Sequence, residues 1–230
     1  PPQCSEAADT AGGSAKDAPA EGTPAQRTIW ETVKHHFAVS ACILQKDARI
    51  GKIIGFYSVV FAAHTLLFFY SQQYFADFGY NKVQISVIML LVGGASCFGA
   101  LASEKMYRRF GKRCLIPETV IIAAAILCYG SGKAGVAAAA LMCAGFANAA
   151  LYPIQSDSLN ALIPSEQRAT LISVDSMCFS IAMIVLFPLA GAFADRWGLK
   201  TVLLLLGAIL LLFLLAAFCI EKESFSSDHS

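Results

Sequence analysis

Apolar residues in this chain gather in six long runs, and short polar segments separate them. A hydrocarbon core of about 30 Å requires about 20 apolar residues in one helix, close to the length of most of these runs. Because backbone groups find no water in lipid, each run must bond its own N–H and C=O groups and therefore forms a helix. The pattern predicts an all-α integral membrane protein, a bundle of six transmembrane helices. The predicted spans are approximately Ile53 to Phe75, Val83 to Ser103, Cys114 to Ser131, Ala134 to Pro153 with a polar extension, Ala169 to Ala190 and Thr201 to Ile220.

The sequence before the first run changes character at Trp30. The preceding residues are rich in Ala, Gly, Pro and Ser, so we expect a disordered linker or tail that starts inside a longer chain. Trp30, Val33 and Phe37 then recur at helical spacing, which predicts an amphipathic segment on the cytoplasmic membrane surface. The expected domains are a linker at 1–29, the amphipathic segment at 30–52, a six-helix transmembrane domain at 53–221 and a cytoplasmic tail at 222–230.

Lys and Arg side chains are unevenly divided between the two ends of the predicted helices. If the amphipathic segment is cytoplasmic, eleven lie on that side and four on the outer side. Such an excess sets orientation, so we expect both termini in the cytoplasm and the protein in the plasma membrane. The cytoplasmic set is Lys34, Lys46, Arg49, Lys52, Lys105, Arg108, Arg109, Lys112, Arg113, Arg168 and Lys222, and the outer set is Lys82, Lys133, Arg196 and Lys200.

Composition agrees with the membrane class and narrows the function. The chain is 57% hydrophobic and 14% charged, which is unusual for a soluble domain. Its net charge of +1 provides no field that would attract nucleic acid. The sequence contains no glycine-rich phosphate loop, no HExxH, no GxSxG and no CxxC pair among its eight cysteines. We therefore expect no enzyme activity, no cofactor, no metal site and no nucleic-acid partner, and the lipid bilayer is the first expected partner.

The polar loop after the second predicted helix carries a basic motif. It reads Gly99, then Glu104, then RRFGKR from Arg108. This loop resembles the G-x-x-x-D-R-x-G-R-R motif of the major facilitator superfamily. Arg108 stands where the family has Asp, and Glu104 is interpreted as a displaced substitute. The residues that match the basic half are Arg109, Gly111, Lys112 and Arg113.

A second copy of the motif lies between the fifth and sixth predicted helices, in GAFADRWGLK. The segment IPSEQRATLIS, which contains Arg168, resembles the cytoplasmic entry to the superfamily's eleventh helix. In this reading the glycines permit close helix approach, and a carboxylate with arginines at the helix ends forms a latch that breaks during a transport cycle. Alternatively, the positive charges of the basic loop only hold that loop on the cytoplasmic side of the membrane. This role and the latch are compatible. The second copy consists of Gly191, Asp195, Arg196, Gly198 and Lys200.

The resemblance covers roughly residues 30–221 and aligns with the C-terminal half of the twelve-helix fold. Such transporters consist of two six-helix halves around a midplane cavity and alternate access by rocking. The resemblance implies half of a secondary active transporter for a small solute, coupled to a proton or ion gradient, with efflux slightly favoured. Its expected partner is the missing N-terminal six-helix half. Two alternatives stay open: a truncated, non-transporting module that is inert or pairs with a separate half, and an uptake symporter for sugars or nucleosides.

Polar side chains inside the apolar runs are costly in hydrocarbon, so they usually face a bundle interior or a wet cavity. In the first helix they recur every seven residues, and in the fourth at i, i+4 and i+7 beside a kink expected at Pro153. His64 lies near the middle of its span, where an imidazole can bind solute or a proton. Hydrogen bonding between neighbouring helices is the alternative for both stripes. The candidate substrate-binding residues are Tyr57, His64, Ser71, Asn148, Tyr152 and Gln155.

Asp175 is the carboxylate that the sequence favours for proton coupling, together with His64. It shares a helix face with Arg168 and lies about 10 Å further into the membrane. An unpaired charge at that depth is costly, so the neutral acid is favoured. The alternative is a permanent ion pair between Asp175 and Arg168 or a basic loop residue.

Overall fold

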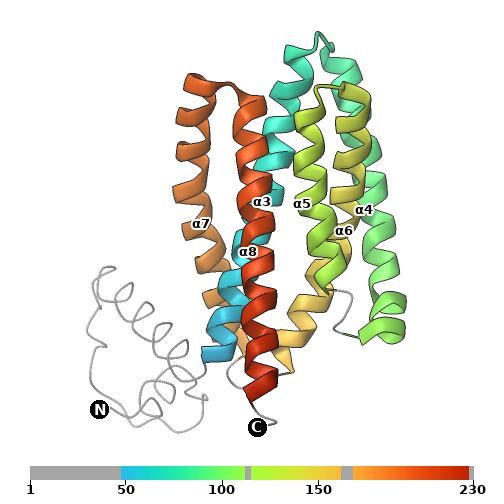
Figure 1. Cartoon of the computed structure of the whole chain (residues 1–230). Coiled ribbons are helices and arrows are strands. Elements are labelled where there is room, and N and C mark those ends of the chain that lie inside the picture. The colour runs from blue at the N-terminus through green and yellow to red at the C-terminus, as the bar shows by residue number, and fades with distance from the viewer. Residues whose placement is uncertain (1–47, 112–114, 162–167, 228–230) are drawn as a thin grey trace, which may run out of the picture.

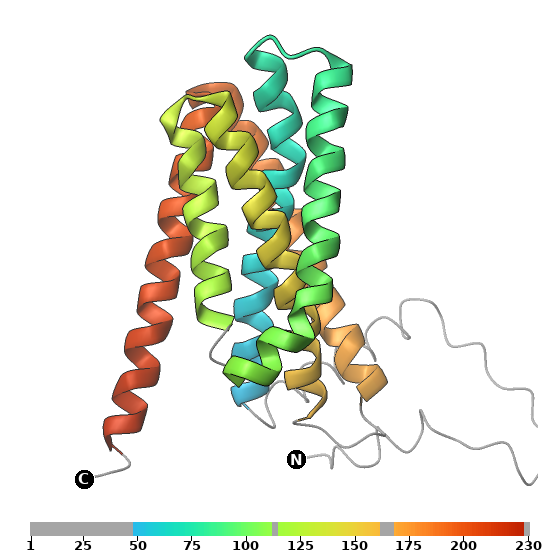
Figure 2. The same cartoon turned by 90° about the vertical axis from the view of Figure 1, so that its right-hand side faces the viewer.

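The computed structural model describes residues 48–111, 115–161 and 168–227, and the regular structure of these residues is entirely helical. Figures 1 and 2 show the helices side by side, with the turns after α3, η2 and α7 at one end of the bundle. The predicted all-α bundle is confirmed. In chain order the elements are α3 (Ala48–Asp77), α4 (Lys82–Phe110), α5 (Leu115–Cys128), the 3₁₀ helix η2 (Tyr129–Ser131), α6 (Ala134–Asn160), α7 (Arg168–Trp197) and α8 (Leu199–Ser227).

Five of these helices, α3, α4, α6, α7 and α8, are long and apolar enough to cross a membrane by length and composition. The apolar helix at Leu115–Ser131 is shorter. Its α-helical part and the 3₁₀ turn together span about 27 Å, only slightly less than a hydrocarbon core of about 30 Å. Each of the six runs in the sequence is therefore helical, and the third is the shortest, as its sequence predicts.

The helices extend beyond the apolar runs because a helix continues past the hydrocarbon boundary wherever its backbone bonds continue. Thus α3 begins at Ala48, inside the expected amphipathic segment, and α8 reaches Ser227, inside the expected tail. α6 likewise continues through Pro153 to Asn160. The expected linker at 1–29 and the amphipathic segment up to residue 47 lie outside the described residues.

Helix α3 occupies the middle of the bundle and packs against each of the other five described helices. Helix α4 packs mainly on α6, whereas α7 packs mainly on α3. These two flanking helices lie at opposite edges of the bundle in Figure 1. The bundle therefore has a central helix and two flanks that are attached in different ways.

Two groups of buried apolar side chains hold the bundle together. The larger joins α3, α5, α6 and α8 and includes Leu67, Ile126, Leu141 and Leu203, each at most 1% exposed. The smaller joins α3, α6 and α7 near the start of α3, and its members are Ile50, Ile54, Leu159, Leu171 and Val174. The second cluster fixes the lower end of α7 to the centre of the bundle.

Candidate functional site

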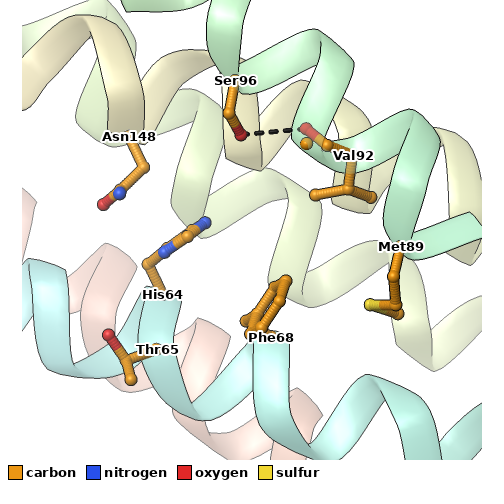
Figure 3. Close-up of a pocket in the computed structure, with 8 residues that line it drawn as sticks. His64, Thr65, Phe68, Met89, Val92, Ser96 and Asn148 are labelled. Carbon is orange, nitrogen blue, oxygen red and sulfur yellow. Dashed lines mark hydrogen bonds between the residues drawn. The ribbon is translucent and has the colours of Figure 1, made fainter. Parts of the chain in front are cut away.

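A cleft of about 340 Å³ opens between α3, α4 and α6 (Figure 3). His64 lines it from α3 and Asn148 from α6, so both side chains border the same cleft (Figure 3). His64 lies close to the middle of its 30-residue helix, which places the cleft near the midplane of the span. The residues that line the cleft are His64, Thr65, Phe68, Met89, Val92, Gly93, Ser96 and Asn148.

The polar groups of this cleft differ in whether they already have partners. The Ser96 hydroxyl donates to the Val92 carbonyl at 2.9 Å, and the Thr65 hydroxyl donates to the Phe61 carbonyl at 2.7 Å. In contrast, His64 Nε2 and Asn148 Oδ1 are buried and make no hydrogen bond. Buried polar atoms are nearly always paired, so these two are the groups available to a bound molecule.

The structure brings together two of the six residues that the sequence proposed for substrate binding, His64 and Asn148. The other four do not line this cleft. Tyr57 is buried beside the Phe56 ring, and the buried Ser71 hydroxyl donates to the Phe68 carbonyl at 2.7 Å. Tyr152 is 58% exposed with its ring against Phe61, and Gln155 is buried at 1% exposure. A substrate-binding role for each of the six stays a prediction.

Asp175 and Arg168 do not form an ion pair in the described part of the chain, where the one ion pair joins Glu104 and Arg108. Arg168 is exposed at the first position of α7, and Asp175 is half-buried about two helical turns later. The Asp175 carboxylate instead faces the Gln155 side chain of α6. No buried atom of the Gln155 amide completes a hydrogen bond, so this contact is loose.

The first loop motif lies at the end of α4. Glu104 and Arg108 form an exposed pair at 2.7 Å one helical turn apart, and the Arg109 guanidinium lies 5.7 Å from the centre of the Phe110 ring. Gly111 ends the helix with a φ of +59°. Lys112 and Arg113 are outside the described residues. A carboxylate of this motif is therefore paired within its own helix.

The second motif copy lies at the opposite end of the bundle, where α7 turns into α8 (Figures 1 and 2). Asp195 and Arg196 are exposed there, and Gly198 makes the turn with a φ of +81°. The carboxylate of one copy and the arginines of the other are thus too far apart to form one latch. Gating roles for Gly99, Gly191 and the charged residues of both copies stay predictions.

Two kinds of residue in the interior escaped the sequence reasoning. Ser96, Thr65 and Met89 line the cleft. Of these three, only Ser96 could have been found from the sequence, because it is a polar residue close to the Gly93–Gly94 pair in an apolar run. Glu118 is buried in α5, and an acidic residue inside an apolar run was a signal that could have found it. In the described ranges no three His, Cys, Asp or Glu side chains are grouped so that they could hold a metal ion.

The comparison with protein families gives one match. The model described as Major Facilitator Superfamily matches residues 119–229, which contain α6, α7, α8 and most of α5. No curated protein and no solved structure matches the chain. The match includes the second motif copy at 191–200 and leaves the first, at 99–113, outside, so the C-terminal part of the chain is similar to the major facilitator superfamily.

Proposed function

We propose that this chain is the C-terminal half of a secondary active transporter, and that the cleft between α3, α4 and α6 binds a small solute. The observation that carries the proposal is the pair of unpartnered atoms, His64 Nε2 and Asn148 Oδ1, whose residues line the same cleft near the middle of the span. A polar group without a partner in a membrane interior is costly, and the usual compensation is a ligand or a wet cavity. The match of residues 119–229 to the Major Facilitator Superfamily model supports transport as the activity.

The lining of the cleft indicates the kind of solute. Phe68, Met89 and Val92 provide apolar walls, and His64 with Asn148 provides polar contacts from two directions. Pockets of this kind bind small, largely apolar molecules and orient them with few polar contacts. Because Asn148 Oδ1 accepts hydrogen bonds, the solute should carry an O–H or N–H group that can reach it.

The proposed partner is an N-terminal six-helix half. Helix α7 buries none of its most apolar stretch and α4 buries 11% of its own, whereas α3 buries 50%. Lipid or a second half would cover such flanks, and rocking of two halves about a midplane site is the mechanism of this transporter class. We place both termini in the cytoplasm and the protein in the plasma membrane, with proton or ion coupling through Asp175 or His64 and with efflux as the direction.

The test is transport by the full gene product in proteoliposomes, with panels of amphipathic solutes and an imposed pH gradient. Asn148→Leu should lower uptake of the transported solute by at least about tenfold, because the polar contact to Asn148 Oδ1 is replaced by an apolar side chain. Asn160→Leu is the matched control, since this asparagine ends the same helix away from the cleft.

Equal transport by the two asparagine variants would contradict the assignment of the cleft. Saturable flux through the purified 230-residue chain as a monomer would contradict the half-transporter proposal, because one half cannot line both sides of a pathway.

A further inference from the structure

The most deeply buried carboxyl group that the structure describes is Glu118, in the first turn of α5. Its side chain is 1% exposed, and neither Oε1 nor Oε2 makes a hydrogen bond. The hydroxyl of the next residue, Thr119, is no partner because it donates to the Leu115 carbonyl at 2.8 Å. Glu118 is therefore an acid enclosed by protein with both oxygens unpaired.

No cation of the described part of the chain neutralises this carboxyl group. Helix α5 packs against α3, α6, α8 and η2. The charged residues of those elements whose side chains are described are all exposed, and none of them forms an ion pair with Glu118. The other titratable side chains described there are tyrosines, one cysteine and one histidine. The charged set is Lys52, Asp77, Asp157 and Lys200, and the remaining titratable set is Tyr57, His64, Tyr70, Tyr74, Tyr129, Cys143 and Tyr152.

Among the described residues, an ionised carboxylate in this position would be a buried charge with no cation beside it. The effective penalty for such a charge is several kcal/mol even after the protein relaxes. A protonated acid avoids that penalty and leaves only the smaller cost of burying a neutral polar group. The burial of Glu118 without a partner consequently favours the acid form over the carboxylate.

We propose that Glu118 is a proton-binding site inside the membrane domain, occupied in the conformation described here and emptied when α5 becomes accessible to water. The step is the dissociation of the O–H bond, with the proton transferred to water and the electron pair kept by the carboxylate. The link to solute transport rests on the function proposed above. Asp175 is less suited to the same task, because it is only half-buried and faces the Gln155 amide.

The protonation state can be measured without any transport assay. Infrared spectra of the full protein in lipid at neutral pH should contain a carboxylic acid C=O band, and Glu118→Gln should remove it. Glu104→Gln is the matched control, since that carboxylate is exposed and paired with Arg108. Asp175→Asn shows how much of the band comes from Asp175, the other acid in the apolar part of the bundle. The Glu104 variant should keep the band. A wild-type spectrum without the acid band, or an acid band of undiminished intensity in Glu118→Gln, overturns the proposal.

A second infrared measurement uses the wild-type protein, so it does not depend on whether the Glu118→Gln variant folds. Wild-type protein labelled with ¹³C at the glutamate side-chain carboxyl should show the acid band shifted to lower frequency. The band should also respond slowly to D₂O because the site is closed. An acid band that ignores the glutamate label, or its absence, contradicts a proton on Glu118.

Transport then tests the coupling separately. Glu118→Gln should lower gradient-driven accumulation at least about fivefold while solute exchange without a gradient continues. An acid band at Glu118 with unchanged gradient-driven accumulation overturns the coupling role. If no solute is transported by any form of the protein, the proposed function fails, and the infrared result alone decides the proton site.

Discussion

The two flanking helices are attached to the bundle by contrasting chemistry. Helix α4 meets α6 through glycines, whose missing side chains allow the backbones to touch. Helix α7 meets α3 through the smaller apolar cluster at its first turns, and further along through large aromatic rings and one interhelical hydrogen bond. The difference indicates which flank can move against the centre of the bundle and which cannot.

At the α4–α6 contact, a Cβ atom on Gly99 would collide with the backbone carbonyl of Phe146. On the other side of the same contact, a Cβ on Gly145 would lie 2.9 Å from the Ser96 hydroxyl and 3.1 Å from Val92 Cγ1. Small residues at helix interfaces in membranes permit such packing, which is stabilised by van der Waals contact. Close-packed backbones cannot slide without losing this contact, so α4 and α6 should move as one unit.

At the α3–α7 contact, the Tyr70 and Phe187 rings stack with centres 5.5 Å apart, and Phe69 meets Phe187 edge-on at 5.7 Å. The Tyr70 hydroxyl donates to the Phe187 carbonyl at 3.2 Å. The next residue, Pro188, has no N–H and leaves one carbonyl of α7 without its helical partner. Side chains can adopt new rotamers where touching backbones cannot, so α7 is the flank with more freedom.

The largest expected effect is the loss of the α4–α6 contact in Gly99→Leu. The added side chain must displace the Phe146 backbone, and we expect the free energy of unfolding to fall by about 3 kcal/mol. Titration with SDS in mixed micelles measures this energy. Gly94→Leu is the matched control on the same helix, because nothing lies within 4 Å of its Cβ position. Equal effects of the two variants would contradict the backbone contact.

Gly99 is also a position where sequence and structure agree for a physical reason. A glycine at the polar end of an apolar run predicts a close helix approach, and the structure places it against Phe146. The runs themselves located all six helices, because lipid requires an apolar surface along the whole span. Hydropathy falls before a helix ends, however, so the polar end of α8 was not predicted, whereas the polar extension expected after Pro153 is part of α6.

The candidate site was harder to predict because α3 touches every other described helix. Each face of such a helix is covered, so a seven-residue spacing cannot distinguish a cleft from a packed core. Tyr57 and Ser71 are core residues, while His64 on the same stripe faces the cleft. The cleft is also lined by Ser96 of α4. No residue pattern within α3 or α6 indicates that this part of α4 packs beside them.

A smaller effect is expected at the α3–α7 contact in Phe187→Ala. The substitution removes two ring contacts of about 0.5–1.5 kcal/mol each, so the total loss should be about 2 kcal/mol. Lipid replaces part of the lost contact, and the same SDS titration measures the remainder. Leu189→Ala serves as the control, since this side chain is 47% exposed on the same helix. A loss as large as that of Gly99→Leu would erase the contrast between the flanks.

Tyr70→Phe should have a still smaller effect, because it keeps the ring and removes only the hydrogen bond to Phe187. Interhelical hydrogen bonds in membrane proteins contribute about 0.6 kcal/mol on average. The unfolding energy should fall by about that amount, while Tyr107→Phe, at a residue 37% exposed on α4, leaves it unchanged. A loss of several kcal/mol would show that the bond, and not the ring, holds α7.

The smallest expected effect is that of Gly191→Ala, and its sign depends on Tyr70. The added Cβ would lie 3.2 Å from the Tyr70 hydroxyl, so this oxygen must move by a few tenths of an ångström. Alanine gains up to about 1 kcal/mol over glycine in a helix, which nearly offsets that displacement. In the Tyr70→Phe background the oxygen is absent, and the same substitution should then stabilise the protein by about 1 kcal/mol. A double-mutant cycle measures the coupling directly. Strictly additive effects would mean that α7 stands further from α3 than the structure places it, whereas a coupling of the expected sign supports a side-chain contact that can adjust.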